Sequence, residues 1–349
     1  MLDKSIFREY DIRGIVETQL QDAEVIAIAS AYATVFKREN KNTIALGMDG
    51  RDSSERIKNL TAETFASFGL DVIDIGLVPT PMMYYAVFKY DMDGGIIITA
   101  SHNPAEYNGF KALIGKQATS GDQVEEIYHI AVSGQYAVKG KGSISRKEIL
   151  QDYIEYITGH LKIGKKVKVV VDSGNGTGGI SSVPLYKALG AEVIDIYSEV
   201  DGRFPNHHPD PTKIKNLQDL IRKVKETDAD IGIGFDGDAD RIGVVDKKGN
   251  ILWGDMMMIL FAEEILKTMP GATFISEVKA SEVMYSEIRR MGGNPIMWKT
   301  GHSLIKKKIV ETNAVLAGEV SGHIFFNDRW FGFDDAVYAG ARLIEILSN

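Results

Sequence analysis

Residues 43–48 read Thr-Ile-Ala-Leu-Gly-Met and lead into a polar loop, a helical stretch over 56–68, a glycine and a second apolar run over 71–75. Apolar residues recur every two residues in the first run, about every 3.6 residues in the helical stretch and every two residues again in the second run. This order is typical of a βαβ unit, in which a glycine is expected directly after the helix. The same order recurs over 168–196 and over 273–298. We therefore predict an α/β fold made of three related domains.

The three predicted domains cover residues 1–148, 149–253 and 254–349. The first junction is placed after a polar stretch rich in Gly and Lys, 133–147, and the second at the turn 249–255 that leads into a helical segment. In open α/β sheets ligands gather at the carboxyl ends of strands. The loops that follow the apolar runs are therefore the places to search for chemistry.

The composition excludes several classes of protein. The chain has 349 residues, of which 44% are hydrophobic and 25% charged, as in an ordinary globular protein. No run approaches the roughly 18–20 apolar residues of a membrane span, and residues 1–8 contain no apolar signal segment, so we expect no membrane partner. The absence of cysteine excludes disulfides and thiolate sites and fits a cytoplasmic protein. A net charge of −8 disfavours nucleic acid as a partner.

The loop 99–104 reads Thr-Ala-Ser-His-Asn-Pro and follows an apolar run. A serine at a strand-to-loop corner, beside His102 and ahead of a proline, offers an exposed hydroxyl as a nucleophile. The alternative for Ser101 is a turn serine that bonds its own backbone. The Gly-x-Ser-x-Gly pattern of hydrolases is absent.

The loop that follows 231–235 carries three carboxylates at alternate positions, Asp236, Asp238 and Asp240. Carboxylate oxygens with small residues between them can converge on one hard cation, and Mg²⁺ is the simplest candidate. Arg241 at the sixth position and Lys247 at the twelfth argue against a calcium-binding EF-hand. The alternative is an exposed acidic turn.

Two further loops have both a chemical and a structural interpretation. Glu319 and Ser321 stand two residues apart and could bridge neighbouring sugar hydroxyls, or they could form a hairpin turn with a surface glutamate. The loop 172–179 contains Gly174, Gly176 and Gly179, which fit a dinucleotide-binding pattern. A structural turn before a helix expected at 184–189 is favoured, because Asp195 lies inside an apolar run and the other two repeats lack these glycines. His129 and His160 are expected on helix surfaces.

Ordered motifs along the whole chain resemble those of the α-D-phosphohexomutases, in particular the bacterial phosphomannomutase/phosphoglucomutase branch. The motifs are Phe7–Gly14, Thr99–Pro104, Asp201–Pro211, Asp236–Arg241, Trp298–His302, Gly318–His323 and Arg329–Asp335. The resemblance implies mixed sheets sandwiched by helices, with an active-site cleft between the domains. It also implies an isomerase whose partners are small-molecule hexose phosphates, expected as a monomer with a dimer as the alternative.

The reaction implied by the resemblance is the reversible, Mg²⁺-dependent transfer of phosphate between O6 and O1 of a mannose or glucose phosphate. Ser101 would be the phosphoserine, and one of its phosphate oxygens would join Asp236, Asp238 and Asp240 around Mg²⁺. A 1,6-bisphosphosugar would be the intermediate, with glucose 1,6-bisphosphate or mannose 1,6-bisphosphate as activator. Phosphoryl transfer needs positioning and charge neutralisation, which agrees with this set of residues.

The resemblance assigns roles to further residues. Lys111 and His302 would move the hydroxyl proton, and Glu319 and Ser321 would bind sugar O3 and O4, which are oriented alike in glucose and mannose. The remaining catalytic residues would be Arg13 and His102, and the remaining substrate contacts Tyr10, Arg241, Lys279 and His323.

The chain departs from the family pattern in two places. Ala239 stands where the pattern usually has glycine, a change that should leave the carboxylates in place. The family's fourth domain, whose loop holds the non-reacting phosphate, is expected to be absent because the sequence ends at Asn349. Two alternatives therefore stay open: a fragment that binds sugar phosphates without turnover, and an NAD(P)-dependent oxidoreductase that uses the glycine-rich loop.

Overall fold

The computed structural model describes residues 2–349, which separate into two units. The first unit contains the residues up to Ile149 together with the short segment Asp201–Arg203, and the second contains Leu150–Val200 and Phe204–Asn349. The three predicted βαβ repeats supply three sheets, one in the first unit and two in the second. We keep 1–148, 149–253 and 254–349 as the proposed bounds of the three domains.

The first unit is built on a seven-stranded sheet in the order β1-β5-β4-β2-β3-β7, with β6 beside β5. Its strands are β1 (Ile12–Ile15), β2 (Thr43–Met48), β3 (Asp71–Leu77), β4 (Gly94–Ile98), β5 (Tyr107–Ile114), β6 (Gln117–Ala118) and β7 (Ile144–Arg146). Its helices are η1 (Lys4–Ile6), α1 (Val16–Gln19), α2 (Asp22–Arg38), α3 (Ser54–Ser67), α4 (Thr80–Lys89) and α5 (Asp122–Ser133). β2, β3, β4 and β7 pair in parallel, whereas β5 runs antiparallel to β4 and β1, so the sheet is mixed.

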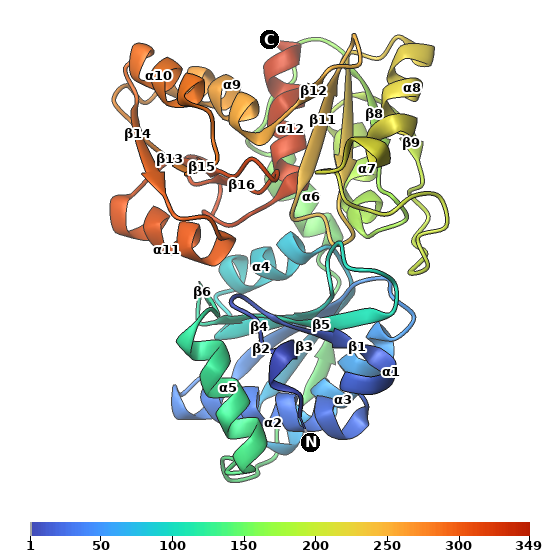
Figure 1. Ribbon diagram of the computed structural model, residues 1–349, viewed down its shortest axis with the longest axis vertical. Helices are drawn as coiled ribbons and strands as arrows, with labels where there is room; N and C mark the ends of the chain where they lie inside the picture. The colour runs from blue at the N-terminus through green and yellow to red at the C-terminus, as the bar shows by residue number, and fades with distance from the viewer. Residues whose placement is uncertain (1) are drawn as a thin grey trace. The chain divides into compact units, whose positions relative to one another are not determined.

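Helices cover both faces of this sheet, with α4 on one face and α2, α3 and α5 on the other (Figure 1). The main core lies on the second face, where Phe36 and Phe65 from the helices pack against Leu46 and Phe110 from the strands. On the opposite face Gly95 allows close packing of α4, because a Cβ at this position would lie 2.6 Å from the Met83 sulfur. The face a strand residue occupies follows from the alternation of side chains along the strand.

The second unit begins with a five-stranded mixed sheet in the order β12-β11-β10-β8-β9. Its strands are β8 (Lys168–Asp172), β9 (Glu192–Ile196), β10 (Ile231–Phe235), β11 (Ile242–Asp246) and β12 (Ile251–Leu252). The helices that accompany it are α6 (Leu150–Thr158), α7 (Gly178–Ala188), η2 (Ile214–Leu217) and α8 (Gln218–Thr227). α8 packs on one face through Leu220 and Val224, and α7 lies against the other.

The third sheet has four strands in the order β14-β13-β15-β16. Its strands are β13 (Thr273–Glu277), β14 (Asn294–Trp298), β15 (Leu316–Gly318) and β16 (Ile324–Phe326), and its helices are α9 (Gly254–Leu266), α10 (Glu282–Arg290), α11 (His302–Thr312) and α12 (Ala336–Ser348). α12 follows β16 in the chain but packs against β11 and α7 of the five-stranded sheet. This contact joins the two sheets into one unit.

The structure differs from the sequence expectation at two elements. α7 begins at Gly178 and contains Pro184, whereas the sequence predicts a helix that begins at this proline. A proline removes one backbone donor, and here the helix continues around it. The stretch 133–147, expected as a junction, contains β7, which pairs with β3 at the edge of the first sheet. Between residues 2 and 349, no helix combines the length and the apolar character needed to cross a membrane.

Candidate active site

Ser101 lies in the loop that follows β4, at a backbone φ of +51° that side chains other than glycine rarely adopt. Its amide donates to Thr99 Oγ1 at 2.9 Å, and its hydroxyl oxygen lies 3.0 Å from His102 Nδ1. The sequence predicted an exposed hydroxyl, but the residue is only 1% exposed. The backbone therefore turns sharply at the candidate nucleophile and holds its hydroxyl against an imidazole.

Cationic side chains gather at this loop from neighbouring strands. Arg13 on β1 forms an ion pair with Asp11 at 2.6 Å and donates through Nη1 to the side-chain oxygen of Asn103 at 2.9 Å. Lys111 is buried on β5, and Arg13 is paired with Gly109 of the same strand. Because positions 109 and 111 share a face, both cations lie on the face opposite the main core.

Arg51 is a residue of this region that sequence reasoning did not single out. It follows β2, which neighbours β4 in the sheet, and it forms a buried ion pair with Asp49 at 3.1 Å. Its guanidinium also donates to the carbonyl of Ser101 at 2.8 Å. The sequence feature that could have identified Arg51 is the Asp-x-Arg pattern directly after an apolar strand. Charged residues at strand ends of α/β folds are candidates for a functional site.

The three aspartates of the loop after β10 lie together in the second unit. Asp236, Asp238 and Asp240 are at most 1% exposed, and each offers a carboxylate oxygen within 4.8 Å of the other two. An exposed acidic turn is therefore excluded. Like charges this close and this buried repel one another unless a cation lies among them, and hard oxygen donors suit Mg²⁺. The residues fit the predicted cation.

The glycine-rich turn 172–179 supports this acidic loop. The amide of Thr177 donates to the Gly237 carbonyl at 3.0 Å, and the Thr177 hydroxyl approaches the same oxygen at 3.3 Å. A Cβ at Gly176 would lie 2.6 Å from that oxygen. Gly176 is thus required by the close approach of two backbones. This accounts for the pattern that had allowed a dinucleotide-binding interpretation.

His323 lies between two carboxylates at the end of the hairpin formed by β15 and β16. Its Nδ1 is 2.5 Å from Glu319 Oε2, and its Nε2 is 3.2 Å from Asp240 Oδ1. Burial lowers the pKa of this imidazole, but Asp240 and Glu319 outweigh it and raise the pKa to about 9. A protonated ring donates from both nitrogens, so the 3.1 Å approach of Arg241 Nε to Nε2 is then a close contact of two donors.

Glu319 is buried in this hairpin and is not the surface glutamate that the alternative interpretation expected. Its second oxygen accepts the Gly301 amide at 2.7 Å. Burial raises the pKa of the Glu319 carboxyl, but the effect of the His323 ring is larger and opposite. The pKa of Glu319 therefore lies below its usual range. Glu319 is therefore a carboxylate at neutral pH, and Ser321 stands partly exposed two residues beyond it.

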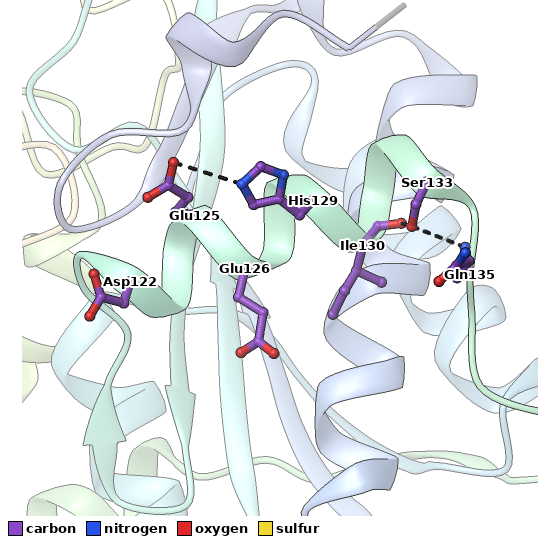
Figure 2. Close-up of a pocket in the computed structure, with 7 residues that line it drawn as sticks. All are labelled: Asp122, Glu125, Glu126, His129, Ile130, Ser133 and Gln135. Carbon is purple, nitrogen blue, oxygen red and sulfur yellow. Dashed lines mark hydrogen bonds and ion pairs between the residues drawn. The ribbon is translucent and has the colours of Figure 1, made fainter.

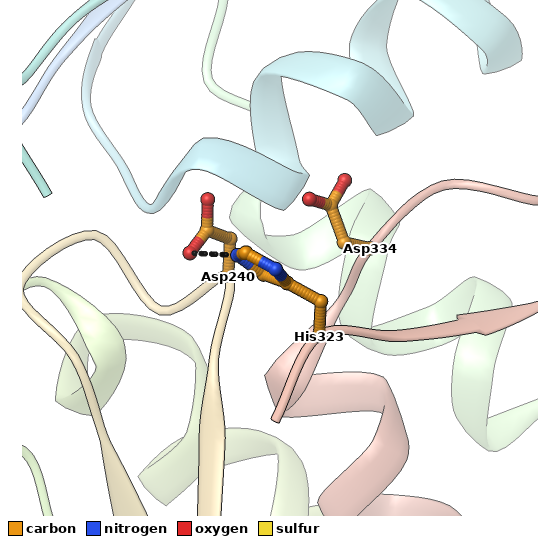
Figure 3. Close-up of side chains that lie close together, drawn as sticks. All are labelled: Asp240, His323 and Asp334. Atoms are coloured by element: carbon orange, nitrogen blue, oxygen red, sulfur yellow. Dashed lines mark hydrogen bonds and ion pairs between the residues drawn. The ribbon is translucent and has the colours of Figure 1, made fainter. Parts of the chain in front are cut away.

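Asp334 makes a second cluster with Asp240 and His323 in the same unit (Figure 3). The ammonium group of Lys306 lies 2.6 Å from one Asp334 oxygen, and His302 Nδ1 lies 3.6 Å from the other. The carboxylate is thus already neutralised by a side chain. We therefore interpret this cluster as a group that lies beside His302 and not as a second metal site. Sequence analysis did not single out Asp334 or Lys306 as functional residues.

The other predicted residues lie at different places. Lys279 is two-thirds exposed, with its ammonium 3.9 Å from the buried Glu277 carboxylate. Tyr10 is half-buried in the turn before β1. His129 lies on the surface of α5, as expected, in a shallow hollow lined by acidic side chains such as Glu125 (Figure 2). None of the four loops discussed above lines this hollow.

The predicted residues divide between the two units. The first unit holds the candidate nucleophile with its cations: Tyr10, Arg13, Ser101, His102 and Lys111. The second holds the carboxylates and the remaining basic residues: Asp236, Asp238, Asp240, Arg241, Lys279, His302, Glu319, Ser321 and His323.

Comparison with known proteins gives consistent matches over the whole chain. Family models described as phosphoglucomutase/phosphomannomutase alpha/beta/alpha domains I, II and III match residues 4–137, 151–249 and 253–349. A phosphomannomutase/phosphoglucomutase of Pseudomonas syringae is 47% identical over 349 residues, which is 100% of this chain and 75% of that protein. A phosphoglucomutase of Neisseria meningitidis is 46% identical and is also covered to 75%. The chain spans about three quarters of the length of these relatives.

A solved structure is similar over the same extent. The crystal structure of a phosphoglucomutase/phosphomannomutase family protein from Burkholderia thailandensis matches with a TM-score of 0.97 at 44% identity. The match covers 100% of this chain and 78% of that chain.

Proposed function

Because the chain belongs to the phosphoglucomutase/phosphomannomutase family, we propose that it catalyses the reversible transfer of phosphate between O6 and O1 of a hexose phosphate. Ser101 carries the phosphate in the resting enzyme. The observation that supports this most strongly is the trio of buried carboxylates, whose charges need a cation of the kind that phosphoryl transfer uses. The serine loop and the acidic loop both follow strand ends, as ligand-binding loops in α/β folds do.

The proposed transfer moves one phosphoryl group in each half-reaction. The bond between phosphorus and Ser101 Oγ breaks, a bond from phosphorus to a sugar hydroxyl oxygen forms, and the serine oxygen leaves as an alkoxide or takes up a proton. The product is a 1,6-bisphosphosugar. Its other phosphate then returns to Ser101, with the bond changes reversed, and leaves the isomeric monophosphate.

The residues of the acidic loop fit a Mg²⁺ ion, which when bound neutralises charge on the moving phosphoryl group. Asp236, Asp238 and Asp240 would hold it, together with an oxygen of the Ser101 phosphate. Arg13, Arg241 and Lys279 bind phosphate oxygens by charge-assisted hydrogen bonds.

Proton transfer is assigned to two basic side chains. When a sugar hydroxyl attacks, its proton goes to Lys111 or to His302, and the same group returns a proton in the reverse direction. Within the same unit the Asp334 carboxylate lies 3.6 Å from His302 Nδ1, and Lys306 pairs with that carboxylate at 2.6 Å. His102 bonds the serine hydroxyl and orients it.

Glu319 and Ser321 are proposed to bind sugar O3 and O4. Each carboxylate oxygen has two lone pairs, so Glu319 can accept from sugar hydroxyls while it keeps its bonds to Gly301 and His323. Glucose and mannose differ at C2, so such contacts accept both. Comparison of kcat/KM for mannose 1-phosphate and glucose 1-phosphate tests this, and a preference above about 10³-fold would contradict it.

The decisive experiment is intact mass measurement and peptide mapping after incubation with glucose 1,6-bisphosphate and Mg²⁺. We expect the mass of one phosphate on the peptide that contains Ser101 and none in Ser101→Ala. Mannose 1,6-bisphosphate is the second donor to test. Uptake by Ser101→Ala, or no uptake by the unchanged chain with either donor, would refute the phosphoserine assignment.

A further inference from the structure

Arg51 donates from all three guanidinium nitrogens to oxygen atoms of the first unit, where its side chain is 1% exposed. A guanidinium has five N–H donors, and five oxygen atoms lie within hydrogen-bond distance of this one. The acceptors are Asp49 Oδ2 at 3.1 Å and the carbonyl oxygens of Pro104 at 2.5 Å, Asn103 at 2.7 Å, Ser101 at 2.8 Å and Tyr107 at 3.0 Å. The donors are therefore matched one for one.

Four of these acceptors belong to the segment 101–107 that carries the candidate nucleophile. The two Nη2 hydrogens go to Ser101 and Asn103, and the two Nη1 hydrogens go to Pro104 and Tyr107. A planar group with fixed donor directions holds several carbonyls at set positions. Arg51 thus ties the start and the end of the loop to one rigid group.

The backbone of Ser101 needs such a restraint. Its φ of +51° is costly for a residue with a Cβ and persists only where surrounding contacts fix it. The Arg51 bond to the Ser101 carbonyl restrains the peptide that follows this residue, while Thr99 accepts from the amide that precedes it.

Arg51 is itself fixed from two sides. Asp49 neutralises its charge and accepts from Ser54 Oγ at 2.6 Å, which orients the carboxylate. The segment Asp201–Arg203 packs on its backbone, because a Cβ at Gly202 would lie 2.6 Å from the Arg51 Cα. The group that restrains the loop is thus held on both sides by its own unit.

We propose that Arg51 is a positioning residue for the nucleophile, acting on Ser101 through the backbone of its loop. The assignment rests on the proposed function of Ser101. Arg51 does not bind the substrate, because its five donors go to protein oxygens. Lysine cannot replace it, since an ammonium group has three donors and no plane.

The test compares Arg51→Lys with Arg56→Lys. Arg56 lies in the same unit, bonds a carboxylate of Asp22 and the Leu20 carbonyl, and does not touch the segment 101–107. The first measurement is the rate of phosphate transfer from glucose 1,6-bisphosphate to Ser101, followed by intact mass. We expect Arg51→Lys to lower the maximal rate at least tenfold, with less than a twofold change in the half-saturating concentration. Arg56→Lys is expected to match the unchanged chain.

The second measurement is hydrogen–deuterium exchange of peptides covering 99–107, with peptides of α2 as the internal reference. We expect at least tenfold faster exchange in 99–107 and no change in α2. A merely structural role would instead raise exchange across the unit. A rate within twofold of the unchanged chain, or unchanged exchange in 99–107, would overturn the proposal.

Two outcomes require a further variant or measurement. If Arg51→Lys does not fold, Asp49→Asn takes its place, with at least threefold effects of the same sign expected and the same overturning results. If the unchanged chain takes up no phosphate, the proposed function fails, and exchange alone decides: faster exchange confined to 99–107 supports the positioning role and unchanged exchange overturns it.

Discussion

The serine loop (residues 99–107) and the acidic loop (236–241) are built alike and stabilised differently. Each follows a fully buried strand, β4 or β10, and each contains a residue other than glycine with positive φ, Ser101 at +51° and Ala239 at +56°. The serine loop is held by cationic side chains: Arg51 donates to the Ser101 carbonyl and Arg13 to the side-chain oxygen of Asn103. The backbone of the acidic loop is held by a neutral group, the Thr177 amide on the Gly237 carbonyl, while one of its carboxylates, Asp240, pairs with His323.

This difference follows from the charge that each loop has to receive. A loop that accepts a phosphoryl group gains from fixed positive charge behind its backbone. A loop that accepts a divalent cation needs carboxylate charge available for it, and a neutral donor such as the Thr177 amide holds the backbone without competing for the carboxylates. The two loops should therefore respond in opposite ways when their charges are removed.

The largest effect is expected from Asp238→Asn. We predict that Mg²⁺-dependent phosphate transfer falls by about 10²-fold or more, because one ligand charge is lost. In the absence of metal the same variant should melt at a higher temperature, because one of three repelling buried charges is gone. Transfer rates at several Mg²⁺ concentrations and melting curves with and without Mg²⁺ measure both. A lower metal-free melting temperature would contradict the comparison.

Gly176→Ala disturbs the contact between the glycine-rich turn and the backbone of the acidic loop. The new Cβ would lie 2.6 Å from the Gly237 oxygen and 2.9 Å from its Cα, so backbone has to move, at a cost of about 1–3 kcal/mol. We also expect weaker Mg²⁺ binding. The control is Gly190→Ala, at a φ of +94° with no described atom within 4 Å of the added carbon. It should lower the free energy of unfolding by about 1 kcal/mol and leave Mg²⁺ binding unchanged. Equal Mg²⁺ affinity in both variants would refute this role of Gly176.

His207→Gln tests a difference in pH response between the two supports. His207 Nε2 lies 3.0 Å from Asp172 Oδ2 in the glycine-rich turn, and although burial lowers the pKa of this imidazole, Asp172 raises it above 6.5 overall. The stability from this pair is therefore fully present below pH 6.5 and is lost as the pH rises through the folded-state pKa.

Urea unfolding of the unchanged chain and His207→Gln at several pH values from 5.5 to 9 measures this effect. We expect the stability advantage of the unchanged chain to shrink by less than about 1 kcal/mol over that range. An advantage that grows with pH would contradict the sign. The support of the serine loop should give no such response, because it rests on a guanidinium group and not on an imidazole.

Ala239→Gly should have the smallest effect. Glycine relieves about 1 kcal/mol of strain at φ of +56°, but the buried methyl group contributes about 0.8 kcal/mol and glycine loses more entropy on folding. We expect the free energy of unfolding to change by no more than about 0.5 kcal/mol and Mg²⁺ dependence by less than twofold. A change above about 1 kcal/mol in chemical unfolding would show that the strain is not balanced in this way.

The sequence predicted the parts of the fold that depend on local pattern. The shift between strand and helix periods located the three βαβ repeats, and the strand-end rule selected the loops of Ser101, Asp238 and Glu319. The predicted start of α7 was wrong. Proline is common at the first position of a helix, but Pro184 lies inside α7, which begins six residues earlier at Gly178.

The supporting residues could not be predicted, because their contacts depend on sheet order. Arg51 reaches Ser101, 50 residues away in sequence, because β2 and β4 are neighbours in the sheet. Lys306 of α11 meets Asp334, which follows β16 and forms an antiparallel bridge with Phe325 of that strand. The spacing of apolar residues along the chain predicts neither of these contacts.

The segment Asp201–Arg203 has a consequence for synthesis on the ribosome. The residues up to Ile149 leave the ribosome first, yet Gly202, which packs against the Gly50–Asp52 backbone, is made more than fifty residues later. The first unit therefore completes its folding while the second is already emerging. A nascent chain released at residue 150 would expose the backbone of Arg51, and one released after residue 203 would not.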